Sequence, residues 1–293
     1  MSAPAHSAEL RLMGAPLCLG ALISPAAMVR NLVSHRALIV QFVRREFLAR
    51  NRGSILGFFW TILHPLLMLA VYTFVFSVVW NARWVGNGSE QESRSLFAIG
   101  VFCGLIVWEV FSSGVGAAAT TIIGQSNLVK KVIFPLEVLP LANIGTGLLV
   151  GGISLLILIA ANSIMGNGIS TTIWALPFVL IPLLALTCGL AWLVASLGVF
   201  LRDLRQLVAG ILLPVLMFTS PIFYPAERVP TAFRWMIDFN PLACIIENAR
   251  AVVLFSRPPD WTRLGIVTVA SLIVMQLGYA FFMKSKRSFA DVL

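Results

Sequence analysis

Hydrophobic residues in this sequence are concentrated in six long runs, which polar or proline-containing segments separate. Each run approaches or exceeds the ~20 residues that an α-helix needs to cross a bilayer. A helix satisfies its own backbone hydrogen bonds in lipid, whereas an open sheet does not, so the pattern predicts an all-α integral membrane protein with six transmembrane helices. The predicted spans are Ile55–Trp80, Leu96–Thr120, Leu139–Asn162, Ile173–Phe200, Leu207–Tyr224 and Leu264–Met283.

Two of these runs differ from the others. The fifth is short for a crossing and contains Pro214 and Pro221. Proline removes a backbone donor and kinks a helix interior, so we expect this helix to be bent or broken. The second run is the one that contains a charged residue, Glu109.

Residues 28–50, ahead of the first span, have the pattern of a basic amphipathic helix. Such a helix lies in the membrane interface, with its charged groups near the lipid phosphates. Two interpretations remain open: a simple topology anchor, or a docking surface and lateral gate for an anionic lipid. The apolar residues at helical spacing are Val29, Leu32, Val33, Ile39, Val40, Val43 and Phe47.

The domain organisation follows from these segments. Residues 1–27 are predicted to form a lead-in, because the apolar stretch Pro16–Val29 is too short to span and its weakly charged front makes a poor signal peptide. The six-helix transmembrane domain takes residues 51–287, and residues 288–293 form a cytoplasmic tail.

The connection Tyr224–Arg263 is long, apolar and rich in proline. Within it, Phe233–Asp238 and Ala243–Phe255 have helical patterns but are too short or too charged to cross. Irregular backbone at membrane depth is tolerated only where protein or water covers it. We therefore predict short re-entrant or surface helices on the outer side, within residues 226–256.

The distribution of basic residues predicts the orientation. Of the 21 Lys and Arg residues, fourteen precede the first span, follow the last, or lie in the second-to-third and fourth-to-fifth connections. Cytoplasmic segments carry an excess of Lys and Arg. Both termini are therefore predicted to be cytoplasmic.

Composition agrees with the bilayer as the solvent. The chain is 59% hydrophobic and 11% charged, with a mean hydropathy of +0.92, whereas soluble domains carry about 25% charged residues. The net charge of +9 comes from residues at the ends of apolar runs, which favours membrane topology over nucleic-acid binding. The four cysteines predict neither a disulfide framework nor a metal site, since they are far apart: Cys18, Cys103, Cys188 and Cys244.

No motif in the sequence predicts catalysis by this chain. It contains no G-x-x-x-x-G-K-[ST] nucleotide loop, no H-E-x-x-H and no G-x-S-x-G. We therefore predict that the chain is not an enzyme, holds no cofactor of its own, and depends on another protein for energy.

Glu109 is the single acid in a predicted span. A carboxylate at mid-helix costs about 2.5–3.5 kcal/mol on insertion scales, so its side chain should face protein or water. It is either a functional residue or a carboxyl that is protonated or hydrogen-bonded to a neighbouring helix. The sequence offers it no basic partner, which slightly favours the second interpretation.

Aromatic residues are frequent in the first span and at the end of the fifth. Trp60 and Trp80 fit interfacial anchors, which concentrate at the bilayer surfaces. A second interpretation is a conduit whose flat apolar faces stack against the C–H faces of sugars. The candidate conduit residues are Phe59, Trp60, Tyr72, Phe74, Phe218, Phe223 and Tyr224.

Three stretches together resemble a known family. They are Asn51–Gly57 with Trp60, His64–Leu67 and Tyr72–Phe76; Gly104–Trp108 with Asn127–Pro135, Leu139 and Pro140; and Phe200–Leu204 with Ser220–Tyr224 and Asn240–Leu242. In this order they are similar to the permease subunit of ABC exporters for O-antigen, capsular polysaccharide or teichoic acid. The resemblance covers residues 28–287.

That resemblance implies a homodimer in the bacterial inner membrane, which moves a lipid-linked glycan through a central channel. A separate ATP-binding cassette ATPase, which holds ATP and Mg, is expected to dock on the coupling loop Gln125–Phe134. Its candidate contacts are Ser126, Asn127, Lys130 and Lys131. The helix with Arg44, Arg45 and Arg52 corresponds to the gate near the lipid headgroup, and residues 226–256 to the outer gate. Family members often have Asn in place of Glu109.

Three other functions remain to be weighed. An ABC exporter of a small molecule, drug or other lipid predicts a tighter, closed cavity with fewer aromatic residues. An ion-coupled secondary transporter predicts inverted repeats and a midplane ion site, and the sequence has neither. A membrane-embedded glycan enzyme predicts clustered acids or histidines, whereas the outer-loop acids are scattered: Glu227, Asp238, Glu247 and Asp260.

Overall fold

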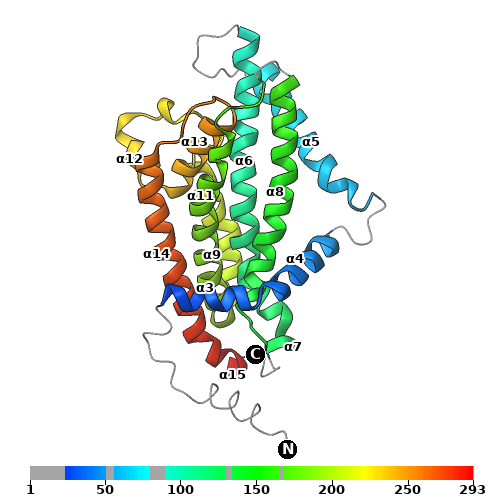
Figure 1. The fold of residues 1–293 in the computed structure, drawn as a ribbon, viewed down its shortest axis with the longest axis vertical. Coiled ribbons are helices and arrows are strands. Elements are labelled where there is room, and N and C mark those ends of the chain that lie inside the picture. The colour runs from blue at the N-terminus through cyan, green and yellow to red at the C-terminus, as the bar shows by residue number, and fades with distance from the viewer. Residues whose placement is uncertain (1–23, 51–55, 80–89, 130–133, 165–167, 293) are drawn as a thin grey trace, which may run out of the picture.

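The computed structural model describes residues 24–50, 56–79, 90–129, 134–164 and 168–292, and within these ranges it is helical without strands (Figure 1). Five helical stretches of the described residues are long and apolar enough to cross a membrane. They correspond to the first, second, third, fourth and sixth predicted spans. They contain α5 (Phe59–Thr73) with the π-helix η1 (Phe74–Val79), α6 (Glu90–Thr121), α8 (Val138–Ile164), α9 (Leu176–Phe200) and α14 (Trp261–Ser285).

The fifth predicted span corresponds to a shorter and irregular helix, Leu204–Thr219. It consists of α10 (Leu204–Leu207), the π-helix η4 (Val208–Leu212) and α11 (Leu213–Thr219). The wide turn of η4 directly precedes Pro214, which cannot donate to a carbonyl one turn back and whose ring crowds that turn. The proline that predicted a bent helix is thus accommodated by a local π-helix.

The core lies between α6, α8, α9, α13 (Pro241–Val253) and α14 (Figure 1). Its large buried side chains include Trp192 and Phe111, which are almost inaccessible to solvent. Helix α5 packs differently, because it stands at one edge of the bundle and leaves most of its apolar side chains exposed. In the described monomer, α5 is therefore the span with the least intramolecular cover.

Two glycines allow a close backbone contact between α9 and α14. A Cβ atom added to Gly278 of α14 would lie 2.1 Å from the carbonyl oxygen of Gly189 on α9. A Cβ added to Gly189 would lie 2.6 Å from the backbone of Met275. Helices in membranes associate largely through such close backbone packing, since the hydrophobic effect does not drive them together. Neither position can therefore carry a side chain without separating the two helices.

The segment predicted as one helix over residues 28–50 is two helices, α3 (Pro25–Ser34) and α4 (Arg36–Arg50), which meet at His35. The His35 backbone N–H still donates to Asn31 O at 3.2 Å, so the break is a local change of direction. Helix α4 packs against α8, where the Val43 side chain fills the space that a Cβ of Gly145 would need. Both helices lie at the end of the bundle that also holds α15 (Phe289–Val292) (Figure 1).

The connection between Leu204–Thr219 and α14 contains the two short helices that the sequence predicts, together with two 3₁₀ turns. Helix α12 (Arg234–Asp238) is exposed for most of its length, whereas α13 is mostly buried against α6 and α9. The Asn240 side chain caps α13 by accepting a hydrogen bond from Leu242 N at 3.0 Å. The 3₁₀ turns are η5 (Ala226–Arg228) and η6 (Thr231–Phe233).

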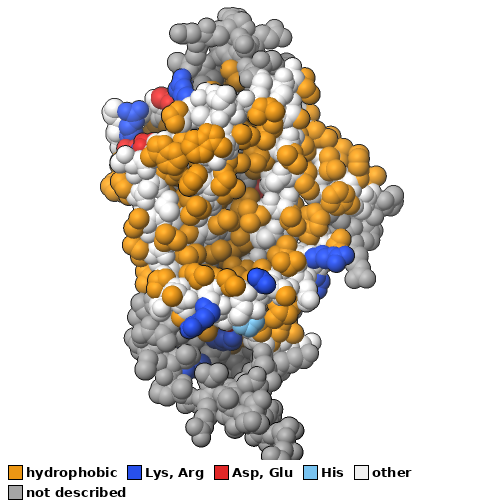
Figure 2. Space-filling view, viewed as in Figure 1, with side chains coloured by type: hydrophobic (Ala, Val, Ile, Leu, Met, Phe, Trp, Pro, Cys, Tyr) orange, Lys and Arg blue, Asp and Glu red, His pale blue; other side chains and the backbone are white. Residues whose placement is uncertain are grey.

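On the face shown in Figure 2, side chains of different kinds occupy different levels along the long axis. A hydrophobic middle zone covers the height of the long helices, and Lys and Arg side chains gather at the end occupied by α3 and α4. Around α12, at the opposite end, basic and acidic side chains occur together. This arrangement is typical of a protein whose middle zone contacts lipid.

We expect Gly278→Leu to separate α9 from α14 and to lower the free energy of unfolding by about 1–3 kcal/mol, the usual cost of overpacking. Gly265→Leu, on the same helix with no atom near its added Cβ, is the matched control. Denaturant titration of the purified proteins in mild detergent measures both. Equal stability of the two variants would contradict the packing role of Gly278.

Candidate functional site

The candidate site begins at the coupling loop, which follows α6. Its described part contains the 3₁₀ turn η2 (Ile123–Gln125) and α7 (Ser126–Val129), at the same end of the molecule as α3 and α4 (Figure 1). Ser126 is half-buried and Asn127 is exposed. The other two predicted contacts, Lys130 and Lys131, lie outside the described residues. In the monomer, the polar face of α7 with Asn127 is thus exposed and available to a partner protein.

Helix α4 contacts the coupling loop at both of its ends. Arg45 Nη2 donates to Gln125 Oε1 at 3.1 Å, and the Arg45 guanidinium lies 4.3 Å from the centre of the Phe42 ring. The Phe42 ring is in turn 5.4 Å from that of Phe134, at the other end of the loop. A displacement of the loop therefore acts directly on the helix that carries the predicted gate arginines.

A buried carboxylate, Glu137, joins four elements beside the coupling loop; we call this group the Glu137 cluster. Lys286 Nζ donates to Glu137 Oε2 at 2.7 Å, and Asn31 Nδ2 donates to Glu137 Oε1 at 2.9 Å and to Tyr279 OH at 2.8 Å. Trp192 Nε1 donates to the Glu137 carbonyl at 3.0 Å. The cluster thereby fixes α3, the start of α8, α9 and the end of α14 to one another.

The protonation state of Glu137 depends on its neighbours in this cluster. Burial raises its pKa, but the nearby Lys286 ammonium and the hydrogen bonds from Lys286 and Asn31 outweigh burial, so the net pKa lies below the usual 4.5. The carboxyl group is therefore ionised at neutral pH. Only 3% of the Glu137 surface is exposed to solvent. An ionised, buried and fully paired carboxylate makes a specific junction between these helices.

The predicted gate arginines have different surroundings. Arg44 is exposed, Arg45 binds the coupling loop as described above, and Arg52 lies outside the described residues. A further arginine of α4, Arg50, contacts Glu109 of α6, with its Nη2 3.3 Å from Oε1. The expectation that Glu109 has no basic partner is wrong, because Arg50, which is distant in sequence, reaches it once α4 has packed against α8.

Some of the predicted conduit aromatics lie together. Tyr72 stacks on Phe76 at 6.3 Å between ring centres, Phe76 on Phe223 at 6.4 Å, and Phe223 lies 6.0 Å from Phe218. Tyr224 OH donates to the Phe218 carbonyl at 2.9 Å. The row connects the upper part of α5 with the end of α11.

The remaining predicted aromatics are exposed on α5 and outside this row. Phe59 and Trp60 lie at its first turn, and Phe74 begins η1. At 1.5 Å per residue, about 20 Å of helix separates Phe59 from Tyr72. The aromatic residues therefore extend along the length of α5, with their row closing only near its outer end.

The outer end of the site is fixed by a buried arginine, Arg250 of α13. Its Nε donates to Gly100 O at 2.9 Å, its Nη1 to Pro221 O at 2.6 Å and to Glu247 Oε1 at 2.9 Å, and its Nη2 to Ile222 O at 2.7 Å. Carbonyls beyond a helix end have no partner in that helix. Arg250 supplies donors to the chain just after α11 and holds it against α6.

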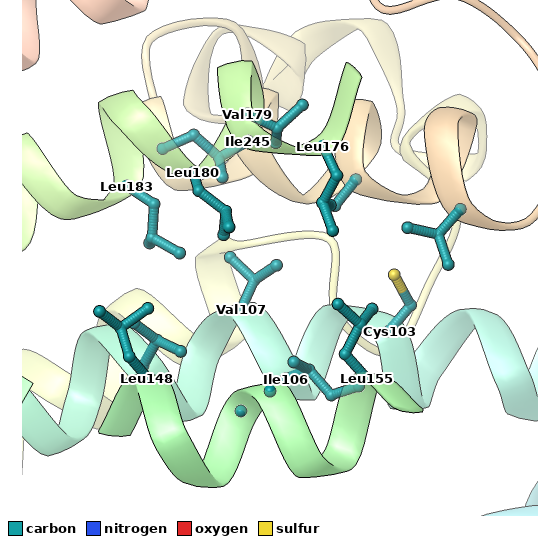
Figure 3. Close-up of a pocket in the computed structure, with 15 residues that line it drawn as sticks. Cys103, Ile106, Val107, Leu148, Leu155, Leu176, Val179, Leu180, Leu183 and Ile245 are labelled. Atoms are coloured by element: carbon teal, nitrogen blue, oxygen red, sulfur yellow. The ribbon is translucent and has the colours of Figure 1, made fainter. Parts of the chain in front are cut away.

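An apolar cavity of about 80 Å³ lies between α6, α8, α9 and α13 (Figure 3). Aliphatic side chains such as Val107, Leu148 and Leu183 point into it, together with Cys103. Its volume and lining leave no room for a sugar and no group to hydrogen-bond one. Among the described residues, no group of three or more His, Cys, Asp or Glu side chains is placed to hold a metal ion.

The family model for ABC-2 type transporters matches residues 37–254, from α4 through the end of α13. The chain belongs to the ABC-2 type transporter family. Its match contains the coupling loop, Glu109, the aromatic row and Arg250, whereas α14 and Lys286 lie beyond it.

Individual relatives of this ABC-2 chain are similar over almost their whole length. The O-antigen export system permease protein RfbA of Myxococcus xanthus is 30% identical over 266 residues, which cover 90% of this chain and 98% of that protein. A protein of the same name from Klebsiella pneumoniae is 28% identical over 262 residues, covering 87% and 95%.

Three residues that shape this ABC-2 site were absent from the predicted set: Glu137, Arg250 and Phe76. Glu137 and Arg250 are charges within apolar sequence, a signal that could have marked them as buried and paired. Their partners come from segments far away in the chain, so the sequence alone could not supply them. Phe76 differs from its exposed aromatic neighbours only in the direction its side chain takes.

Replacing Arg250 with Met should lower the free energy of unfolding by about 3–5 kcal/mol, because Glu247 loses its buried partner and three carbonyls lose a donor. Arg257→Met, at an exposed position of the same connection, is the control. Denaturant titration in mild detergent gives both values. A loss below about 1 kcal/mol at Arg250 would contradict its bridging role.

Acid should weaken the Glu137 cluster in a defined direction. Because the folded pKa is depressed, the stabilisation is complete above the ordinary 4.5 and is lost as pH falls through the lower folded pKa. We expect the unfolding temperature to fall below pH 4.5 in the native protein and to fall less in Glu137→Gln. Asp203→Asn, an exposed carboxylate, should keep the native slope, and identical slopes in all three proteins would refute the assignment.

Proposed function

We propose that this chain is the membrane-spanning subunit of an ATP-driven exporter that moves an O-antigen-like, lipid-linked polysaccharide across the bacterial inner membrane. The observation that carries the proposal is the match along nearly the whole chain to proteins named O-antigen export permeases. The aromatic residues along α5 and α11 support it, since flat apolar faces let a polymer slide through weak, repeated contacts.

The energy comes from a separate ATPase subunit, which binds ATP and Mg at its own site. The docking surface is the exposed face of α7 with Ser126 and Asn127, continued by Lys130 and Lys131. The contacts from Arg45 and Phe42 to both ends of the coupling loop give the route by which docking reaches the gate helix. The permease chain itself performs no hydrolysis.

Six crossings with both termini in the cytoplasm agree with the arrangement in Figure 1. Helices α3 and α15 lie at the same end of the bundle, which supports an even number of crossings. Helix Leu204–Thr219 supplies the sixth: at 1.5 Å per residue it is about 24 Å long. The hydrocarbon core is ~30 Å thick, and the buried turn at Ser220 and Ile222, held by Arg250, extends the element toward the outer surface.

The channel forms between two copies of this chain. Helix α5 supports this, because only 17% of its most apolar stretch is buried within the monomer and its exposed residues include Phe59, Trp60 and Phe74. In the dimer these rings line the conduit. Helices α12 and α13 close its outer end as the gate, with α13 fixed and α12 exposed.

Export is tested in proteoliposomes that contain this chain, its ATPase partner and lipid-linked glycan from the source bacterium. We expect glycan transfer that requires ATP and both proteins. Asn127→Trp should lower it about tenfold, equivalent to ~1.4 kcal/mol of lost coupling. Thr262→Trp, exposed at the opposite end, is the control. Transfer that continues without the ATPase would overturn the proposal.

A further inference from the structure

A large open cavity lies beside α4, the helix predicted to lie in the membrane interface. We call this cavity the polar hollow. Its volume is about 630 Å³, within the ~300–1,000 Å³ of small-molecule sites. Three helices, α4, α6 and α8, form its walls, and Leu213 of α11 closes one side. The polar side chains of its lining are Glu46, Arg50, Glu109, Ser112, Ser113, Asn143 and Thr146.

The depth of the hollow makes this polarity unusual. Glu109 lies twelve residues before the cytoplasmic end of α6 at Thr121, which is about 18 Å along the helix. Polar and charged groups at such depth are costly in lipid and face protein interiors or water-filled cavities. The polar hollow is thus a place where a hydrated ligand can stay within the bilayer without losing its hydrogen bonds.

The hollow offers both donors and acceptors. Arg50 has several N–H donors, of which one bonds Glu109. The hydroxyls of Ser113 and Thr146 donate to carbonyls of their own helices, at 3.2 and 2.9 Å, and keep oxygen lone pairs as acceptors. Asn143 Nδ2 donates to Thr121 Oγ1 at 2.8 Å. Such a mixed set matches sugar hydroxyls, each of which both donates and accepts.

The charges of the hollow select against ionic ligands. Two carboxylates, Glu46 and Glu109, accompany one guanidinium, Arg50. A phosphate would meet two like charges, and Arg50 is already 3.3 Å from a carboxylate. A simple cation would meet the guanidinium. A neutral ligand rich in hydroxyls is the class that gains hydrogen bonds from all three groups without repulsion.

An aromatic pocket continues from the hollow. It has a volume of about 150 Å³, and it shares Arg50 and Glu109 with the hollow. Tyr72, Trp108 and His64 contribute to its lining. Hydroxyl-binding groups on one side and flat rings on the other are complementary to the polar edge and the C–H face of a pyranose.

We propose that the polar hollow binds a sugar unit of the lipid-linked glycan, with Glu109 and Arg50 as hydrogen-bonding residues. This rests on the proposed export function and adds a defined saccharide subsite to it. The lipid phosphates stay outside the hollow, toward the exposed arginines of α4. The Arg50–Glu109 pair holds the empty site in shape, and sugar hydroxyls bond both groups when the site is occupied.

Photocrosslinking tests the proposal with the dimer and its ATPase partner in nanodiscs. A benzoylphenylalanine replaces Ala49, an exposed residue at the rim of the hollow, or Leu272, an exposed residue of α14 outside it. The probes are lipid-linked glycan from the source bacterium, labelled in its sugars, and undecaprenyl pyrophosphate without sugar. We expect sugar label on the protein from position 49 and little from position 272.

Substitutions at Glu109 separate recognition from mere proximity. Glu109→Leu removes the hydrogen-bonding group and should lower sugar labelling from position 49 at least about fivefold. Glu109→Gln keeps a donor and an acceptor of the same size and should retain most of the labelling. Crosslinking of the sugar-free lipid should be the same in all three proteins, since its phosphates do not enter the hollow.

The possible failures are distinguishable. Sugar labelling from a benzoylphenylalanine at Phe59, with none from position 49, would exclude the polar hollow and leave the export function standing. Labelling from position 49 that Glu109→Leu does not change would exclude recognition by Glu109. An absence of sugar labelling from positions 49 and 59, together with no ATP-dependent transfer in proteoliposomes, would overturn both the subsite and the export function.

Discussion

In the hydrocarbon of a bilayer, every backbone carbonyl and N–H must find its partner within the protein, and this constraint shapes the whole bundle. Regular helices meet it for most of the chain. The exceptions are the helix ends and the irregular helix Leu204–Thr219, where side chains supply the missing hydrogen bonds. Arg250 donates to Gly100, Pro221 and Ile222, so the chain can leave its helix inside the protein without exposing unpaired carbonyls.

Charged side chains are subject to a related constraint, and two of the described ion pairs connect elements that are distant in sequence. Glu137 and Lys286 join the start of α8 to the end of α14, and Arg50 and Glu109 join the interface helix to α6. Glu137 is buried, and a buried charge left alone is strongly destabilising, so its pair with Lys286 specifies how these helices assemble. One pair lies beside the predicted coupling loop, and the other lies in the proposed saccharide subsite.

These connections extend from the end of the bundle that holds the coupling loop toward the end that holds α12. The coupling loop contacts α4 through Arg45 and Phe42, and α4 forms one wall of the polar hollow through Arg50. The hollow shares Arg50 and Glu109 with the aromatic pocket. Tyr72 lines that pocket and begins the row of rings that ends at Phe218. The coupling loop is therefore connected to the proposed glycan-binding surface through the Arg45 and Phe42 contacts and the wall that α4 forms.

The hydrophobic pattern by itself determined the helical class and the positions of the five long spans, because lipid imposes length and backbone pairing on each helix independently, and the prolines of the fifth run indicated an irregular helix. Tertiary structure alone decided which charges meet. Arg50 reaches Glu109, and Lys286 reaches Glu137, only after helices far apart in the chain have packed. Pairing between distant side chains depends on the crossing and rotation of whole helices, which no local run of residues encodes.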